Sequence, residues 1–318
     1  PHVQRLYHHQ AVRHVRSTIA ALSLLFTGVS QGQHSPLTSQ YMFNGLLINP
    51  AYAGSRDALA VNLTYRHQWV GFDGAPTTQL ISVHSPIKAR KIGLGIQVYN
   101  DRIGVSRETG VMTNYAYRIP FKKGKLQFGI GAGLSALQAD WTQVALQDRS
   151  DMVYSSNSRG AIRPNFSGGV FYYKKAYYLG ASMPFVLAHT YDPSNNTWGL
   201  ASRTEQYQPM VTGGYLCKLN KVLKLKPSTL VRYQVASGIQ ADLNANLIIN
   251  DKIWAGVSYR SEDAVVGMFE VLPTPQWRIG YAYDLGISKL TPYHSGTHEL
   301  MLQYEFGYRI RVRDPRYF

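Results

Sequence analysis

The sequence predicts an all-β protein, a transmembrane antiparallel β-barrel of about 14 strands preceded by a non-strand N-terminal segment at the periplasmic side. Charged residues make up only 16% of the 318-residue chain, against roughly 25% in soluble domains. Tyrosine and glycine are abundant, at 23 and 28 residues. After residue 58 the chain alternates apolar and polar residues in runs that suit tilted membrane strands of about 9–11 residues.

The first 32 residues have the pattern of an export signal. Arg13 and Arg16 precede an apolar run over residues 19–26, and Ser30-Gln31-Gly32 supplies small residues at the expected cleavage position. The apolar run is too short to cross a bilayer as a helix. We therefore expect residues 1–32 to be a signal peptide removed near Gln33, and the mature protein to be exported to the cell outer membrane.

Residues 33–58 precede the alternating runs and are expected to form a docking or plug segment. Within residues 39–55 the apolar side chains cluster without a period of two, and the cluster comprises Tyr41, Phe43, Leu46, Leu47 and Ile48. Asn49-Pro50 predicts a turn, because the proline ring disfavours the α region for the residue before it. Gly54 permits an unusual backbone at the exit. One interpretation is a segment packed against the following fold; the other is a segment that plugs or braces a pore, or meets a partner.

Fourteen alternating runs follow within residues 59–306, the predicted barrel. They occupy residues 59–69, 77–84, 91–100, 110–118, 126–140, 165–173, 177–184, 208–219, 228–234, 240–249, 252–261, 264–271, 276–285 and 298–306. The clearest run sets Ile92, Leu94 and Ile96 on one face against Gly93 and Gly95 on the other. Aromatic residues lie at many strand ends, as in the interfacial girdles of membrane barrels. An even strand number places both ends of a bacterial barrel at the periplasmic side.

The predicted connections alternate in length. Short ones include residues 174–176, 250–251 and 272–275, and long ones are residues 141–164, 185–207 and 286–297. Short periplasmic turns and longer extracellular loops are typical of outer-membrane barrels. Because binding residues concentrate on loops carried by rigid scaffolds, the long loops are expected to form the surface contacts.

Basic residues gather in or beside the predicted short turns. They are Lys88, Arg90, Lys91, Lys122, Lys123, Lys125, Lys174, Lys175, Lys218, Lys221, Lys224 and Lys226. One interpretation is that these turns face the anionic head groups of outer-membrane lipid; the other is an electrostatic landing site for a periplasmic partner. Nucleic acid is not an expected partner of an exported chain, despite a formal net charge of +15. Residues 307–318 form a basic C-terminal tail.

No residue pattern predicts an enzyme, a cofactor or a metal site. The alternate glycines of residues 129–133 lie inside a predicted strand, where they cannot cradle a phosphate. They predict instead a barrel face thinned for the approach of another backbone or a plug. His294 and His298 flank Ser295 in a predicted loop, but triads are recognised by geometry and not by closeness in sequence. The aspartates of the first long loop, Asp140, Asp148 and Asp151, lack the spacing of a calcium loop.

Several motifs together resemble a known family. At the start of the predicted mature chain they are Gln40-Tyr41-Met42-Phe43-Asn44, Asn49-Pro50-Ala51-Tyr52-Ala53-Gly54 and Tyr65-Arg66-His67-Gln68-Trp69, continuing as Val70-Gly71-Phe72-Asp73-Gly74-Ala75-Pro76; near the end they are Tyr283-Asp284-Leu285-Gly286 and Ser295-Gly296-Thr297-His298-Glu299. They closely resemble the PorP/SprF family of type IX secretion system membrane proteins, from near Gln33 to Phe306.

The resemblance implies an outer-membrane barrel without enzymatic activity that works in export and surface retention of proteins, including adhesins used in gliding. It implies two kinds of partner: a secreted protein bearing a type IX C-terminal sorting domain, and periplasmic type IX components linked to peptidoglycan. The alternative function is a channel or transporter for small or hydrophobic solutes. A lumen filled by the N-terminal segment favours the first function, and an open polar lumen favours the second. Residues expected to bind a partner or form the plug are Tyr41, Phe43, Asn44, Asn49, Pro50, Tyr52, Gly54, Trp69, Phe72 and Asp73.

Overall fold

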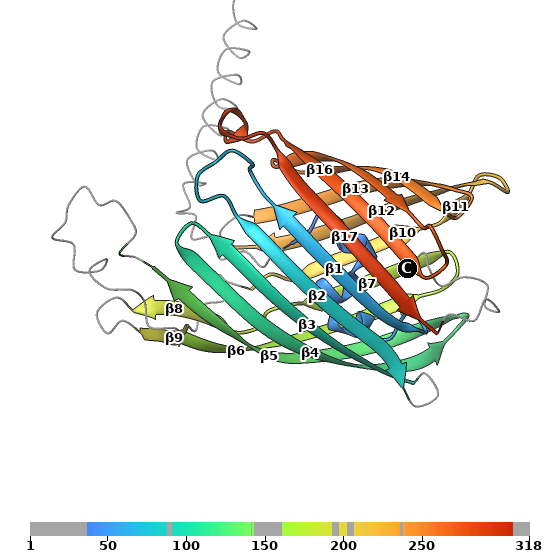
Figure 1. Cartoon of the computed structure of the whole chain (residues 1–318). Helices are drawn as coiled ribbons and strands as arrows, with labels where there is room; N and C mark the ends of the chain where they lie inside the picture. Colours follow the sequence, from blue (N-terminus) through green and yellow to red (C-terminus); the bar gives the residue numbers. More distant parts are fainter. Residues whose placement is uncertain are drawn as a thin grey trace, which may run out of the picture.

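The computed structural model describes residues 37–87, 91–140, 142, 161–192, 197–201, 207–235 and 238–307. Within these residues the chain forms a closed antiparallel β-barrel (Figure 1). Its strands are β1 (Leu59–His67), β2 (Thr77–Ile87), β3 (Ile92–Ile103), β4 (Ser106–Phe121), β5 (Gly124–Ala139), β6 (Ala161–Tyr173), β7 (Tyr177–Met183), β10 (Met210–Tyr215), β11 (Cys217–Lys218), β12 (Leu223–Gln234), β13 (Gly238–Ile249), β14 (Ile253–Arg260), β15 (Ala264–Val271), β16 (Trp277–Gly286) and β17 (Thr297–Phe306).

The barrel closes where its first and last strands meet. β1 pairs with β17 along its whole length, from Leu59 opposite Phe306 to His67 opposite His298. On the other side, β10 pairs with both β7 and β12. β11 also pairs with β12, so β10 and β11 together form one interrupted strand. The described barrel therefore has 14 strands, and the predicted fold class is confirmed.

Side chains alternate between the lumen and the outer face of the wall. In β15, Val266 is buried in the lumen, whereas Val265 and Phe269, at outward positions of the same strand, are 42% and 52% exposed. Large apolar side chains are exposed in this way around the whole barrel, as a lipid-facing band requires. Among the described residues, no helix is long and apolar enough to cross a membrane.

The two ends of the barrel differ. At one end, which we call the short-turn end, β1 begins, β17 ends, and short turns join β4 to β5, β6 to β7 and β13 to β14. At the other, the long-loop end, longer connections leave β1, β5, β7 and β16. One connection at this end is a two-residue turn at Gly104-Val105, where Gly104 adopts φ +56°.

Several strand boundaries differ from those predicted. β4 begins at Ser106 and not at residue 110, and β6 begins at Ala161, within the predicted loop 141–164. β12 begins at Leu223, five residues before its predicted start. Lys224 and Lys226 resemble turn residues, but both lie in the strand, and Lys226 is buried inside the lumen at 1% exposure. The expectation that Lys226 belongs to a basic exterior surface is therefore wrong.

The predicted loop 185–207 also contains regular structure. β8 (Ala188–Asp192) and β9 (Thr197–Ala201) pair with each other as a separate two-stranded sheet. Other predictions fall outside the described residues: the signal peptide, Lys88, Arg90, Asp148, Asp151 and the tail beyond residue 307.

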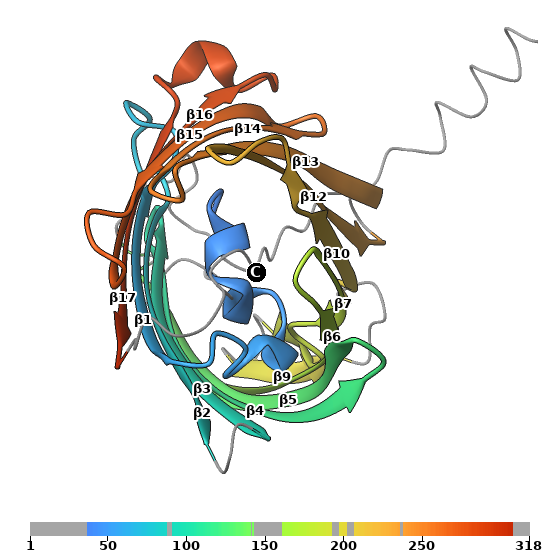
Figure 2. The same cartoon turned by 90° about the vertical axis from the view of Figure 1, so that its right-hand side faces the viewer.

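The N-terminal segment fills the middle of the barrel (Figure 2). Its three short 3-10 turns are η2 (Tyr41–Phe43), η3 (Gly45–Leu47) and η4 (Pro50–Tyr52). We call residues 37–58 the plug. The core of the protein is the contact between this plug and the inner wall: Tyr41, Phe43 and Leu46 are each at most 2% exposed.

Candidate functional site: the occupied lumen

The shape of the plug follows from one Asn-Pro pair. The Asn49 side chain accepts a hydrogen bond of 2.9 Å from the backbone N–H of Ala51 and so caps η4, which Pro50 opens. The same side chain donates through Nδ2 to the carbonyl of Val170 at 3.0 Å, on the inner face of β6. Asn49 therefore sets the turn and fixes it to the wall.

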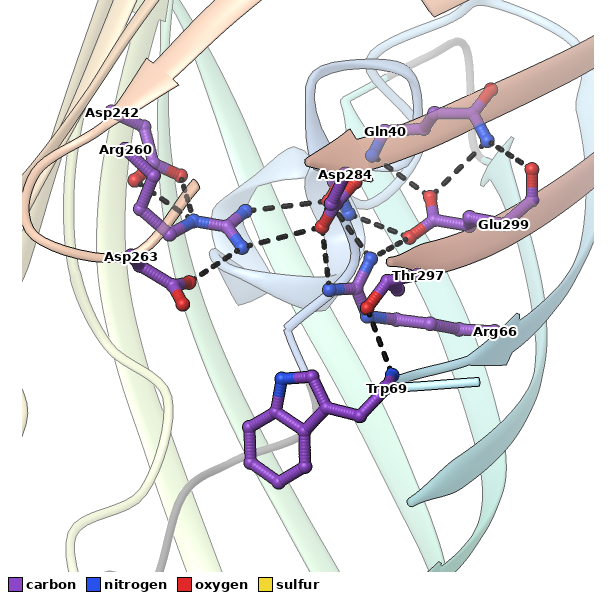
Figure 3. Close-up of polar contacts among 10 residues, drawn as sticks. Gln40, Arg66, Trp69, Asp242, Arg260, Asp263, Asp284, Thr297 and Glu299 are labelled. Atoms are coloured by element: carbon purple, nitrogen blue, oxygen red, sulfur yellow. Dashed lines mark hydrogen bonds and ion pairs between the residues drawn. The ribbon is translucent and has the colours of Figure 1, made fainter. Parts of the chain in front are cut away.

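The start of the plug is held at the long-loop end by a buried carboxylate (Figure 3). The two oxygens of Glu299 accept the backbone N–H groups of Ser39 at 2.7 Å and Gln40 at 2.9 Å. Arg66 donates to Glu299 at 2.9 Å and to Asp284 at 2.7 Å. Glu299, Arg66 and Asp284 are 0–4% exposed, so the charges compensate one another where water cannot. The side chains come from β17, β1 and β16.

A second arginine extends this network along the inner wall, from β16 to β14 and β13. Arg260 of β14 contacts Asp242 at 3.2 Å, Asp263 at 3.3 Å and Asp284 at 3.8 Å. Asp242 also lies near Tyr41, and burial together with this carboxylate raises the pKa of the Tyr41 hydroxyl. The hydroxyl therefore stays protonated, and it accepts a hydrogen bond of 2.7 Å from Asn244.

The end of the plug is held at the short-turn end. Arg56 pairs with Glu305 of β17 at 2.8 Å. Arg118 of β4 pairs with Asp57 at 2.6 Å and also donates to the carbonyl of Gly54. Burial alone would raise the pKa of Asp57, but Arg118 and Lys125 outweigh it and hold this pKa below its ordinary value. The plug is thus tied by charge at both ends and crosses the lumen from the long-loop end to the short-turn end.

The wall is thinned where the plug backbone touches it. A Cβ added at Gly129 would lie 2.1 Å from the backbone nitrogen of Ala51, and one added at Gly93 would lie 2.0 Å from the carbonyl oxygen of Ala53. Only glycine leaves room for such a close backbone approach. The glycine alternation within residues 129–133 predicts a thinned face, and at Gly129 the structure shows the plug backbone against it.

Between the two ends, Phe43 occupies a pocket of the wall. Its ring packs edge-on against Trp254 at 5.4 Å between centroids, and the Arg278 guanidinium lies 5.0 Å from its centroid. Lys226 lies 5.8 Å from the same ring. Arg278 is paired with Glu270 at 3.0 Å. The buried cations of β12 and β16 therefore rest against an aromatic side chain of the plug.

Two small cavities lie beside the plug among the described residues. A cavity against Leu46, Ile48 and Tyr99 has a volume of about 30 Å³, and one against Tyr41 and Tyr52 has about 20 Å³. Each is large enough for a water molecule or two at most.

The predicted partner or plug residues divide into two groups. The structure brings together in the lumen Tyr41, Phe43, Asn44, Asn49, Pro50, Tyr52 and Gly54. It places Trp69, Phe72 and Asp73 outside the lumen, in the β1–β2 connection at the long-loop end. Trp69 is fixed there by a hydrogen bond from its backbone N–H to Thr297 at 3.1 Å, and Phe72 is 47% exposed.

Sequence reasoning missed the charged residues that hold the plug: Arg56, Arg66, Arg118, Asp284, Glu299 and Glu305. The sequence did contain an indication. An isolated charge in a run that otherwise suits a membrane wall costs free energy unless it faces the lumen and is paired. Their partners are up to 260 positions away, so no local pattern could identify them.

The histidines near the end of the chain have local roles. His298 shares a hydrogen bond of 2.7 Å with the hydroxyl of Tyr281, and His294 accepts the backbone N–H of Gly296 at 2.9 Å. The backbone carbonyl of Ser295, not its hydroxyl, accepts from Tyr283. Within the described part of the chain, no three His, Cys, Asp or Glu side chains gather as metal ligands would.

Motifs from opposite ends of the sequence thus converge on one lumen, with the Gln40, Arg66, Asp284 and Glu299 side chains in contact. A family model described as type IX secretion system membrane protein PorP/SprF matches residues 30–304. The chain belongs to the PorP/SprF family. The resemblance seen in the sequence is confirmed, and the molecule is an outer-membrane β-barrel of a secretion-system family.

Two solved structures are similar to this PorP/SprF protein at low identity. The Acinetobacter baumannii outer membrane protein Omp33 is 9% identical with a TM-score of 0.47, covering 79% of this chain and 100% of its own. The CymD monoaromatic hydrocarbon channel is 12% identical with a TM-score of 0.49, covering 86% of this chain and 94% of its own. No curated protein matches the chain.

Proposed function

We propose that this PorP/SprF protein is a non-enzymatic barrel that binds, anchors or helps export a secreted surface protein, and that it does not act as an open channel for small solutes. The observation that carries the proposal is the occupied lumen. The plug crosses it and is tied to the wall by hydrogen bonds from Ser39 and Gln40 to Glu299 at one end and by ion pairs of Arg56 and Asp57 at the other. Among the described residues, cavities of about 30 and 20 Å³ lie where it meets the wall. A solute channel requires an open path, and a segment that occupies the lumen therefore supports the anchor and not the channel.

The partner surface is proposed to lie at the long-loop end, which faces the cell exterior if the short turns are periplasmic. Here the β1–β2 and β16–β17 connections join into one surface through hydrogen bonds between Val70 and Gly296 at 2.9 Å and between Ser295 and Val70 at 2.7 Å. Phe72 and Tyr293 are 47% and 67% exposed on it. Exposed aromatic side chains on a braced loop surface are the usual anchors of a protein interface.

Two classes of partner fit the two ends. A secreted protein with a type IX C-terminal sorting domain would contact the loop surface that carries Trp69, Phe72 and Asp73. Periplasmic type IX or peptidoglycan-linked components would contact the short-turn end, where Lys122, Lys123 and Lys175 are exposed and can attract an acidic partner.

The test is affinity purification of the tagged full-length barrel from outer membranes in mild detergent, followed by mass spectrometry. We expect co-purification of a large secreted protein or of type IX components with the wild type. The double variant Phe72→Ala/Tyr293→Ala should lose the secreted protein while the barrel stays folded. Phe121→Ala removes a ring that is 46% exposed at the opposite end of the barrel. This variant should still co-purify with the secreted protein. Recovery of the barrel alone from the wild type would contradict the proposal and favour the channel.

A further inference from the structure

The outer face of the barrel carries an apolar groove. It has a volume of about 770 Å³, within the range of about 300–1,000 Å³ typical of small-molecule sites. Its lining comes from β7, β10, β12, β13, β14 and the start of β15. Leu179, Leu243 and Val257 on its sides are 56–61% exposed. The groove therefore opens toward lipid and not toward the plug.

The groove exists because the outward positions at its centre are small. Gly213, Pro227 and Ala245 line it, and each alternates with inward-facing neighbours of its own strand. Proline cannot donate a ladder hydrogen bond, and beside Pro227 the wall strand is interrupted at Leu216, between β10 and β11. The result is a depression walled by larger side chains.

The short-turn end of the groove is aromatic and basic. Tyr177 and Tyr215 line it there as a cross-strand pair, and the Nζ of Lys174 lies 4.5 Å from the centroid of the Tyr177 ring. Lys175 is the next residue along the turn and is exposed. Tyrosine rings with a nearby lysine mark the depth at which hydrocarbon meets head groups, and lysine there attracts anionic lipid.

We infer that this groove is a binding site for an anionic phospholipid of the leaflet that contacts the short turns. One acyl chain lies in the groove over Gly213, Pro227 and Ala245, and the phosphate lies beside Lys174 and Lys175. The groove has an apolar lining, with lysines at its short-turn end only. This arrangement matches a lipid, which has one anionic head group and apolar chains.

Native mass spectrometry of the full-length barrel in mild detergent tests this inference. The probes are dioleoyl phosphatidylglycerol and dioleoyl phosphatidylethanolamine, which share their chains and differ in head-group charge. We expect wild-type barrel to bind phosphatidylglycerol preferentially. Ala245→Trp, which fills the groove, and Lys174→Gln/Lys175→Gln, which removes the cations, should each weaken this binding by about tenfold or more.

Matched controls keep the outcome interpretable. Ala132→Trp adds the same ring on the lipid face of β5, and Lys252→Gln removes an exposed lysine from the β13–β14 turn; both should bind phosphatidylglycerol as the wild type does. Gel mobility before and after heating shows that each variant is folded. Three outcomes would overturn the inference: equal binding of the two lipids, equal loss in Ala245→Trp and Ala132→Trp, or a co-purified membrane protein that occupies the groove and excludes lipid.

Discussion

Oε2 of Glu299 accepts a hydrogen bond of 2.7 Å from the backbone N–H of Ser39, across 260 positions of sequence. Glu299 lies in β17, and its ion-pair partner Arg66 lies in β1, the strand that closes the barrel against β17. The site that holds the start of the plug is therefore assembled by barrel closure itself. Folding of the wall and docking of the plug are coupled through these side chains.

Replacing the Glu299 carboxylate should loosen this end of the plug. Glu299→Gln keeps the size of the side chain but leaves Arg66 with a single carboxylate, so we expect a loss of about 3 kcal/mol in the free energy of unfolding. Urea unfolding of the refolded barrel in detergent measures it. Glu262→Gln, at an exposed turn position between β14 and β15, is the control and should stay within about 0.5 kcal/mol of the wild type. Equal urea midpoints of unfolding for the two variants would show that the Glu299 carboxylate does not stabilise the docked plug.

The glycine contacts predict a steric effect. Gly129→Ala would place its Cβ 2.1 Å from the Ala51 nitrogen, so plug or wall must shift, at a cost of about 1–3 kcal/mol. Limited proteolysis should then cut the plug faster than in the wild type. Gly267→Ala, where an added Cβ meets nothing within 4 Å, should digest like the wild type. If both variants digest alike, the plug does not rest on Gly129.

Phe43 should be the main apolar contact of the plug. Phe43→Ala removes the ring packed against Trp254 and Arg278 and should destabilise the barrel by about 3–5 kcal/mol. Phe43→Leu fills more of the same space and should cost less. Thermal unfolding followed by circular dichroism gives the order, and a Phe43→Ala variant as stable as Phe43→Leu would contradict this assignment.

Asp57 should make the short-turn end of the plug sensitive to acid. Arg118 and Lys125 hold its pKa below the ordinary value in the folded barrel. Its stabilising contribution is therefore complete above the unfolded pKa of about 3.9 and is lost as pH falls through the folded pKa. The stability difference between wild type and Asp57→Asn should stay constant from about pH 5 to 8 and shrink below about pH 4. A difference independent of pH down to about pH 2 would rule this out.

Much of the fold could be predicted because a membrane wall imposes a period of two on every strand. The predicted start of β12 was wrong because Lys224 and Lys226, which face the lumen, give this part of the sequence the composition of a turn. It also missed β8 and β9, which pair only with each other and lie in a stretch that resembles an ordinary loop.

The candidate site was only half visible in the sequence. The apolar cluster around Tyr41 and Phe43 breaks the strand pattern, so a segment distinct from the wall could be predicted. The contacts that hold this segment to the wall could not be predicted. Ser39 contacts Glu299, and Arg56 contacts Glu305, only after the barrel closes. The grouping of Trp69 and Phe72 with Phe43 followed sequence motifs that the fold separates into a surface loop and a lumen.

The most direct test of the occupied lumen is the ion conductance of single wild-type barrels in a planar lipid bilayer. We predict no steady conductance for the wild type and open-pore events once the ties of the plug are weakened at both ends, in the double variant Asp57→Asn/Glu299→Gln. A steady ohmic current through the wild-type barrel would contradict the account, because it would reveal an open path for ions beside the plug.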